Sequence, residues 1–142
     1  MSVPVRLQLS RAKGFNLQAL SISTNGLAAI KVDRSSPFGN HYRVDRDRYV
    51  SDDPWIVGER GTIIDQFATK AQAIENAVHR FEADVTQTGP RNHRLIEPVP
   101  TPVDIIKALR GRNLACWCEP GSPCHADVLL RVANGPLCEA VR

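Results

Sequence analysis

Three cysteines and one histidine fall within ten positions near the end of the chain, at Cys116, Cys118, Cys124 and His125. A thiol beside an imidazole can act as a nucleophile with an acid–base partner, and the same two groups also bind zinc. These residues therefore carry the strongest chemical signal in the sequence. The elements on either side decide which of these uses is open to them.

The residues around this cluster predict a strand, a turn and a helix. The apolar run that begins at Asn113 is typical of a short strand, and alternation along it would place the first two cysteines on the same face. Ser122 and Pro123 then predict the N-cap and the first residue of a helix, which residues 134–135 would end in a left-handed glycine cap. The third cysteine and the histidine would lie in the first helical turn, where free N–H groups favour a thiolate or a bound anion.

A second polar loop follows the strand predicted for residues 27–33, which the Asn25–Gly26 turn introduces. It combines a guanidinium, hydroxyls, a glycine and an amide, a mixture that can bind phosphate or ribose oxygens. The alternative is an ordinary turn, in which Gly39 and Asn40 supply positive φ and the polar side chains bond their own backbone. The candidate ligand contacts in this loop are Arg34, Ser35, Ser36, Gly39 and Asn40.

Composition predicts one soluble domain over residues 1–142. Of the 142 residues 42% are hydrophobic, which is enough for one core. An apolar run of about 18 residues and a signal peptide are both lacking, so we expect a cytoplasmic protein without a membrane partner. The net charge of +3 falls short of the basic stripe of a dedicated nucleic-acid binder, and the alternating charges of residues 43–48 are typical of a solvated surface.

Helical periodicity is clearest from residue 70 to residue 85, where Thr69 and Gln72 predict a capping box. A second helix is predicted for residues 103–110 and a strand for residues 62–67, while the first half of the chain is predicted to be mostly strand and loop. This order predicts an α/β fold: a single compact domain with a small, largely parallel, Rossmann-like sheet flanked by helices. Ligands of such sheets bind beyond the carboxyl ends of the strands, so both polar loops should line one pocket.

Three blocks of the sequence resemble a known family, and together they cover nearly the whole chain. They are residues 6–15, residues 32–40 and residues 109–129, the last with its Cys-Trp-Cys and Cys-His-Ala-Asp motifs. The chain thereby resembles the small phage, prophage and bacterial proteins grouped as domain-of-unknown-function family 4326. Such relatives usually carry Trp-Gly-Asn-Pro where this chain has Phe38-Gly39-Asn40-His41. The resemblance implies no activity; it does imply that the two loops belong to one site, in the host cytoplasm if the protein is phage-encoded.

Two functions fit these residues. The first is an enzyme or sensor that binds a nucleotide-like small molecule. Cys124 or His125 would be its reactive group, and Cys118 and the loop residues would contact the ligand. Its reaction would be transfer or hydrolysis of a nucleoside or sugar. The second is a binding module for nucleic acid or a host protein, in which Cys116, Cys118, Cys124 and His125 hold zinc, although the CxCx₅CH spacing departs from the usual CxxC. A third interpretation is that the cysteines, Cys116 above all, are small core residues. The sequence leaves the substrate and the oligomeric state open.

Overall fold

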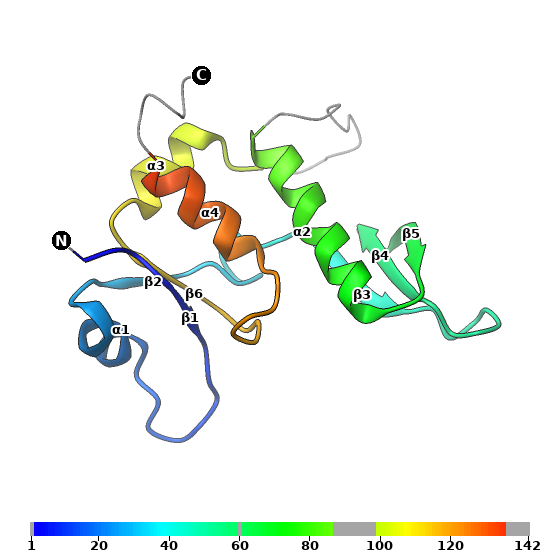
Figure 1. Ribbon diagram of the computed structural model, residues 1–142, viewed down its shortest axis with the longest axis horizontal. Coiled ribbons are helices and arrows are strands. Elements are labelled where there is room, and N and C mark those ends of the chain that lie inside the picture. The colour runs from blue at the N-terminus through cyan, green and yellow to red at the C-terminus, as the bar shows by residue number, and fades with distance from the viewer. Residues whose placement is uncertain (1, 60, 87–98, 136–142) are drawn as a thin grey trace.

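The computed structural model describes residues 2–59, 61–86 and 99–135, and its elements form two adjoining parts (Figure 1). One part contains a sheet of β1, β6 and β2, which we call sheet A; the other contains a sheet of β3, β4 and β5, which we call sheet B. With the four helices of the described residues they form one small mixed α/β domain. In chain order the elements are β1 (Arg6–Gln8), α1 (Leu17–Asn25), β2 (Ala29–Lys31), β3 (Tyr42–Arg46), β4 (Trp55–Glu59), β5 (Thr62–Phe67), α2 (Lys70–Thr86), α3 (Pro102–Leu109), β6 (Asn113–Cys116) and α4 (His125–Asn134).

Sheet A is parallel, and its central strand leads into the cysteine cluster. β6 lies between the other two strands, with Leu114 opposite Arg6 on one side and opposite Ile30 on the other. All four residues of β6 are buried, as expected for a central parallel strand that is covered on both faces. Leu114 and Cys116 face the main core, whereas Ala115 joins a smaller apolar cluster. The strand predicted from residue 113 is therefore confirmed.

Sheet B is an antiparallel meander, so a largely parallel sheet accounts for only half of the strands. β5 matches the strand predicted at residues 62–67, but β3 falls where alternating charges indicated a solvated surface. The charged residues concealed the alternation of buried and exposed side chains that is typical of a strand. Tyr42 is buried and Val44 packs against the core, while Arg43 and Asp45 are exposed. A strand with one solvated face explains both observations.

Helix α1 departs from the prediction that the first half of the chain is strand and loop. Its sequence has no apolar stripe, and Ser21 is its one fully buried residue. The helix is instead defined at its ends: Asn16 accepts the N–H of Ala19 at 3.0 Å, and Gly26 ends the helix with a φ of 78°. The Asn25–Gly26 pair thus ends a helix, and β2 follows three residues later.

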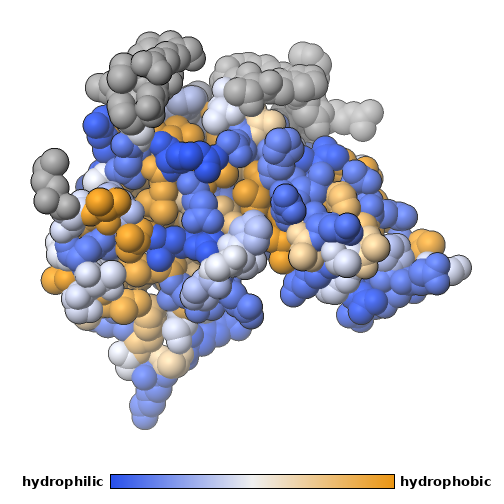
Figure 2. Space-filling view, viewed as in Figure 1, coloured by the Kyte–Doolittle hydropathy of each residue, from blue (hydrophilic) through white to orange (hydrophobic). Residues whose placement is uncertain are grey.

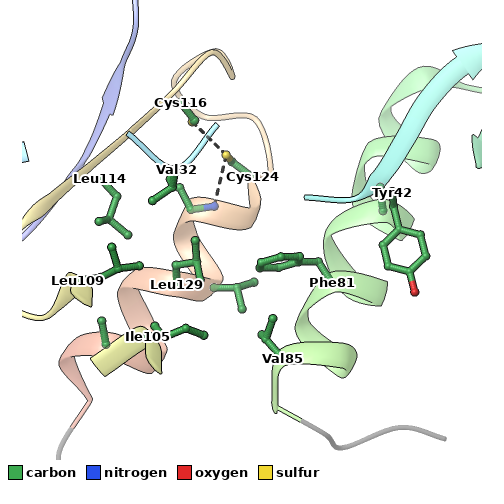
Figure 3. Close-up of a cluster of buried hydrophobic side chains, with 14 of the residues drawn as sticks. Val32, Tyr42, Phe81, Val85, Ile105, Leu109, Leu114, Cys116, Cys124 and Leu129 are labelled. Carbon is green, nitrogen blue, oxygen red and sulfur yellow. Dashed lines mark hydrogen bonds between the residues drawn. The ribbon is translucent and has the colours of Figure 1, made fainter. Parts of the chain in front are cut away.

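Helices α2, α3 and α4 build the main core beside the sheets (Figure 3). Helix α2 and its Thr69–Gln72 capping box match the prediction, and α3 begins at a second capping box, formed by Thr101 and Asp104. Because α2 contacts sheet B on one side and α4 on the other, it joins the two parts of the domain. No helix in the described part of the chain combines the length and apolar character needed to cross a membrane. The largest buried side chains of this core include Phe81, Ile105, Leu109, Leu114 and Leu129.

Helix α4 begins two residues later than the predicted N-cap at Ser122 allows. Cys124 is the N-cap: its backbone is extended (φ −149°, ψ 144°), which keeps Pro123 outside the helix, and its sulfur accepts the N–H of Ala126 at 3.4 Å. The predicted left-handed cap at the other end is also wrong, because Gly135 has a φ of −60°. The consequence is that a cysteine sulfur, rather than a serine hydroxyl, lies at the free N–H groups of the helix.

Candidate functional site

The three cysteines of the C-terminal segment converge on one point. Cys116 ends β6, Cys118 lies in the following turn and Cys124 caps α4, and their sulfur atoms lie within 4.8 Å of one another. The sulfurs of Cys116 and Cys124 are 3.1 Å apart, and both residues are 1% exposed. Cys118 is half-buried and packs against the same core as Cys116, so the two thiols converge as predicted, but β6 ends at Cys116 and Cys118 lies beyond the strand.

The thiols of this cluster differ in acidity. Hydrogen bonds from Cys116 and Cys124 lower the pKa of Cys118, and the positive charge of Arg6 lowers it further, although burial acts in the opposite direction. The pKa of Cys116 is raised, because its thiol donates to Cys118 and Cys124 and is desolvated. The cluster therefore favours a thiolate on Cys118, which hydrogen bonds from the other two cysteines stabilise.

His125 is buried beside the cluster and is fixed on both sides of its ring. Its Nε2 lies 2.5 Å from the carbonyl oxygen of Val32, and Phe81 packs edge-on at 5.3 Å between ring centroids. A carbonyl only accepts, so Nε2 carries the proton, and in a neutral ring Nδ1 is then an acceptor. Nδ1 lies 3.6 Å from the sulfur of Cys124, where it can take the thiol proton.

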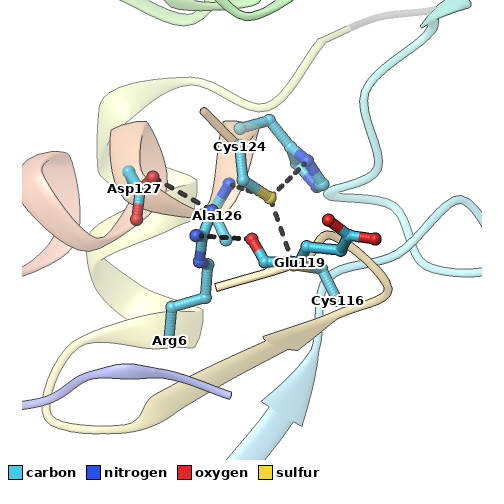
Figure 4. A network of polar contacts seen from close by, with 7 residues as sticks. Arg6, Cys116, Glu119, Cys124, Ala126 and Asp127 are labelled. Carbon is cyan, nitrogen blue, oxygen red and sulfur yellow. Dashed lines mark hydrogen bonds and ion pairs between the residues drawn. The ribbon is translucent and has the colours of Figure 1, made fainter. Parts of the chain in front are cut away.

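Arg6 reaches the cluster from β1, as Figure 4 shows. Its guanidinium donates to Asp127 at 3.1 Å and to the carbonyl of Glu119 at 3.3 Å, and so ties the turn after β6 to α4. Burial lowers the pKa of Arg6, but Asp127 and the thiols outweigh it, so the pKa is raised overall. Sequence reasoning missed this residue, because it is brought to the site by pairing of β1 with β6, more than 100 residues along the chain. The sequence shows only an arginine at a polar position of a short segment that alternates apolar and polar residues.

The Gly39 loop is held mainly by bonds within itself. The hydroxyl of Ser35 donates to the carboxylate of Asp33 at 2.6 Å, and that of Ser36 donates to the Asp33 carbonyl at 2.8 Å. A Cβ on Gly39 would lie 2.6 Å from the Cα of Arg34 and from the Asp33 oxygen. Gly39 is therefore needed for close backbone approach, and the alternative expectation that it supplies positive φ is wrong.

Arg34 and Asn40 hold the end of this loop against β3 and α2. Asn40 donates to the carbonyl of Ala77 at 3.2 Å and accepts the N–H of Tyr42 at 2.9 Å, so both ends of its buried amide are occupied. Arg34 donates to the carbonyls of Asn40 and Tyr42 at 3.4 and 3.3 Å. Burial, with the nearby charge of Arg43, lowers the pKa of Arg34. Within the described residues no carboxylate forms an ion pair with this guanidinium.

One cavity of about 740 Å³ joins the two segments. It lies between the two parts of the molecule, where Figure 2 shows a notch in the surface. The predicted residues Arg34, Asn40, Cys118, Cys124 and His125 line it together with Cys116, whereas Ser35, Ser36 and Gly39 are not part of its lining. The Gly39 loop and the start of α4 thus meet at a single cavity.

The opposite wall of the cavity was not predicted. Apart from Lys70 and Tyr42 it is apolar, and it comes from β3 and the first turns of α2. The sequence signal was available, since these α2 residues belong to the helical stripe that also fills the core. The side chains of this wall are Val44, Ala71, Ile74, Ala77 and Val78.

The donor set of the cluster suits a soft metal ion only in part. Three cysteine sulfurs gather within 4.8 Å, and thiolates are preferred zinc ligands. The predicted fourth ligand, His125, is not in this group, although its Nδ1 lies 3.6 Å from the sulfur of Cys124. Two sulfurs on one tetrahedral zinc are about 3.8 Å apart at Zn–S bonds of ~2.3 Å. The 3.1 Å between Cys116 and Cys124 would therefore have to widen.

Comparison with known proteins gives one match. A family described as "Domain of unknown function (DUF4326)" matches residues 16–135, which include the Gly39 loop, the cysteine cluster and His125. No curated protein and no solved structure matches the chain.

Proposed function

Since the chain belongs to the DUF4326 family of unknown function, which brings no activity with it, we propose from the geometry alone that the cavity binds a nucleotide-like small molecule. The observation that carries the proposal is the single cavity of about 740 Å³ lined by both Arg34 and the Cys124–His125 pair. Small-molecule sites in proteins commonly measure ~300–1,000 Å³, so a mononucleotide or a somewhat larger ligand fits.

The two walls match the two ends of such a ligand. The apolar wall from α2 suits a flat heterocycle, and Arg34, which lacks a carboxylate partner in the described residues, suits a phosphate. The cavity also lies just beyond the carboxyl ends of β2 and β6, the position in which Rossmann-like sheets bind nucleotides. A ligand placed this way would have its middle, the sugar, beside the thiols.

The chemistry proposed for the site is transfer or hydrolysis at the sugar. Nδ1 of His125 accepts the proton of Cys124, whose sulfur then attacks the sugar carbon as the base or phosphate leaves. Water or a second acceptor afterwards displaces the sulfur and releases the sugar. Cys118, which already favours the thiolate form, is the second candidate nucleophile.

The test is ligand binding by native protein. Nucleoside monophosphates, diphosphates and NAD are screened for a rise in melting temperature, and any ligand found is titrated calorimetrically against wild type, Arg34→Met and Arg112→Met. Arg112 is an exposed arginine outside the cavity and serves as the matched control. Loss of charge-assisted bonds worth ~1.5–3 kcal/mol should weaken binding at least about tenfold in Arg34→Met only. Unchanged melting with every nucleotide, or equal affinity in all three proteins, would contradict the proposal.

A second candidate is a zinc-stabilised module that binds nucleic acid or another protein, favoured by the gathering of three sulfurs. Cys116, Cys118 and Cys124 would hold the ion, with His125 or an outside ligand in the fourth position. Purified protein should then contain one equivalent of zinc, and a chelator should lower its melting temperature. Protein free of metal that melts identically with and without chelator would exclude this candidate.

A further inference from the structure

One close contact within the cysteine cluster joins two thiols that neither proposed activity uses as a pair. We propose that Cys116 and Cys124 form a reversible disulfide, so that the cluster is a redox centre that reacts with hydroperoxides. The proposal does not rest on nucleotide binding. Its basis is the separation of 3.1 Å between the two sulfurs, compared with about 2.05 Å in a disulfide.

The positions of the two residues limit how much must move. Cys116 is the last residue of a fully buried strand, and Cys124 is the N-cap of a helix that is packed into the main core. Both backbones are therefore held, and side-chain rotation has to bring the sulfurs closer by only about 1 Å. The sulfur of Cys124 also accepts the Ala126 N–H at 3.4 Å, and because sulfur is a weak acceptor this bond costs little to give up.

An oxidant can reach this pair although both residues are 1% exposed. Cys116 and Cys124 line the cavity of about 740 Å³ together with half-buried Cys118. Hydrogen peroxide is far smaller than this space. The cavity therefore gives the buried thiols access to a small oxidant.

The reaction balances with hydrogen peroxide as the oxidant. One thiol attacks a peroxide oxygen, the O–O bond breaks, and the products are a sulfenic acid and water. The second thiol attacks the sulfenic sulfur, the S–S bond forms, and the hydroxide that leaves takes the thiol proton as water. In total the two thiols lose two protons and two electrons, and hydrogen peroxide becomes two waters. A dithiol reductant reverses the step by thiol–disulfide exchange.

The experiment compares wild type with variants that isolate the pair. Cys118→Ser/Cys138→Ser keeps only Cys116 and Cys124 of the four cysteines, and adding Cys116→Ser gives a matched control with a single thiol. Each protein is treated with excess hydrogen peroxide, alkylated in denaturant and weighed by mass spectrometry before and after treatment with dithiothreitol. Circular dichroism establishes that each variant is folded.

The pair variant should lose two hydrogen atoms, take up no alkyl group and regain two alkylatable thiols after reduction. Wild type should show the same loss of two hydrogen atoms within the tryptic peptide of residues 113–131, and the single-thiol control should not. Two alkylated thiols after peroxide, added oxygen without an S–S bond, or disulfide-linked dimers would each overturn the proposal.

Discussion

The two segments that meet at the cavity are both rich in polar groups, but they use those groups differently. In the Gly39 loop the hydroxyls of Ser35 and Ser36 bond Asp33, and both ends of the Asn40 amide bond backbone. In the segment from Cys116 to His125 the sulfurs contact one another, and the ring Nδ1 of His125 faces a thiol. The hydrogen bonds of the Gly39 loop stabilise the loop's own conformation, whereas the contacts of the cysteine segment hold reactive atoms close together.

Within one cavity, the Gly39 loop therefore serves as scaffold and the cysteine segment carries the reactive groups. Residues whose polar atoms already have partners within the protein have little left for a ligand, so Ser35, Ser36 and Asn40 shape the loop. Arg34 is the group that the loop delivers to the cavity, because its guanidinium lines the space without a carboxylate partner in the described residues. The loop should therefore be sensitive to mutation through stability, and the cysteine segment through reactivity.

The largest effect is expected at the glycine of the scaffold loop. Gly39→Ala places a Cβ 2.6 Å from backbone atoms of Arg34 and Asp33, which cannot move without displacing the loop, and should cost about 3 kcal/mol of unfolding free energy. Gly121→Ala is the control from the cysteine segment: its φ is +84°, but a Cβ there meets nothing within 4 Å. Conformational strain alone should cost it about 1 kcal/mol. Urea denaturation measures both, and equal losses would contradict the assignment of close packing to Gly39.

The next largest effect is expected at Asn40. Asn40→Ala leaves the buried N–H of Tyr42 without a partner and removes the extra bond to the helical carbonyl of Ala77, which should cost about 2 kcal/mol. Ser35→Ala removes only an exposed hydroxyl bond and should change stability by less than about 0.5 kcal/mol. If Ser35→Ala costs as much as Asn40→Ala in thermal denaturation, the loop is not organised around the amide.

The cysteine segment should differ from the Gly39 loop in the reactivity of its thiols. Because the pKa of Cys118 is lowered, this thiol should be alkylated by iodoacetamide below neutral pH, where an ordinary thiol reacts slowly. Arg6→Met removes a nearby positive charge, so the pH above which Cys118 reacts should move up by about 0.7, as expected for an interaction of ~1 kcal/mol. Peptide mass spectrometry follows Cys118 alone, and Arg112→Met is the control.

The lowered pKa of Cys118 also determines how the free energy of unfolding depends on pH. The folded pKa of Cys118 is below the unfolded one, so the ionised thiol stabilises the fold fully above the unfolded pKa. The contribution is lost as the pH falls toward the folded pKa. A Cys118 alkylation rate that tracks that of free cysteine at every pH would show that the cluster does not favour this thiolate.

Periodic apolar patterns made part of this fold predictable. The stripe of α2 and the apolar run of β6 follow from burial on one face or on both, and both elements were found where the pattern placed them. Helix α1 has no such stripe, and β3 alternates apolar residues with charges that conceal it. Sheet B could not be predicted for the same reason, since pairing of β3 with β4 depends on contacts that local pattern does not record.

The site was predictable where chemistry is concentrated in sequence, and not where it depends on strand pairing. Cys116, Cys118 and Cys124 fall within nine positions on either side of one short turn, and so their convergence could be predicted, although Cys118 lies beyond the end of β6. Arg6 reaches the same cluster only because β1 pairs with β6. The engagement of His125 by Val32 likewise depends on the end of β2 lying beside α4, which no local signal gives.

The smallest effect is expected at Ser122, and it tests where α4 begins. A serine N-cap typically contributes about 1 kcal/mol, so Ser122→Ala would cost that much if the helix began there. With Cys124 as the cap, the Ser122 hydroxyl bonds none of the described residues, and the substitution should change unfolding free energy by less than about 0.5 kcal/mol. Ser122 also lines the cavity, so a variant of unchanged stability but altered ligand affinity would assign its hydroxyl to the ligand rather than to the helix. A loss of 1 kcal/mol in denaturation, with Cys124→Ala neutral, would instead move the start of α4 back to Ser122 and remove the sulfur from the helix N-terminus.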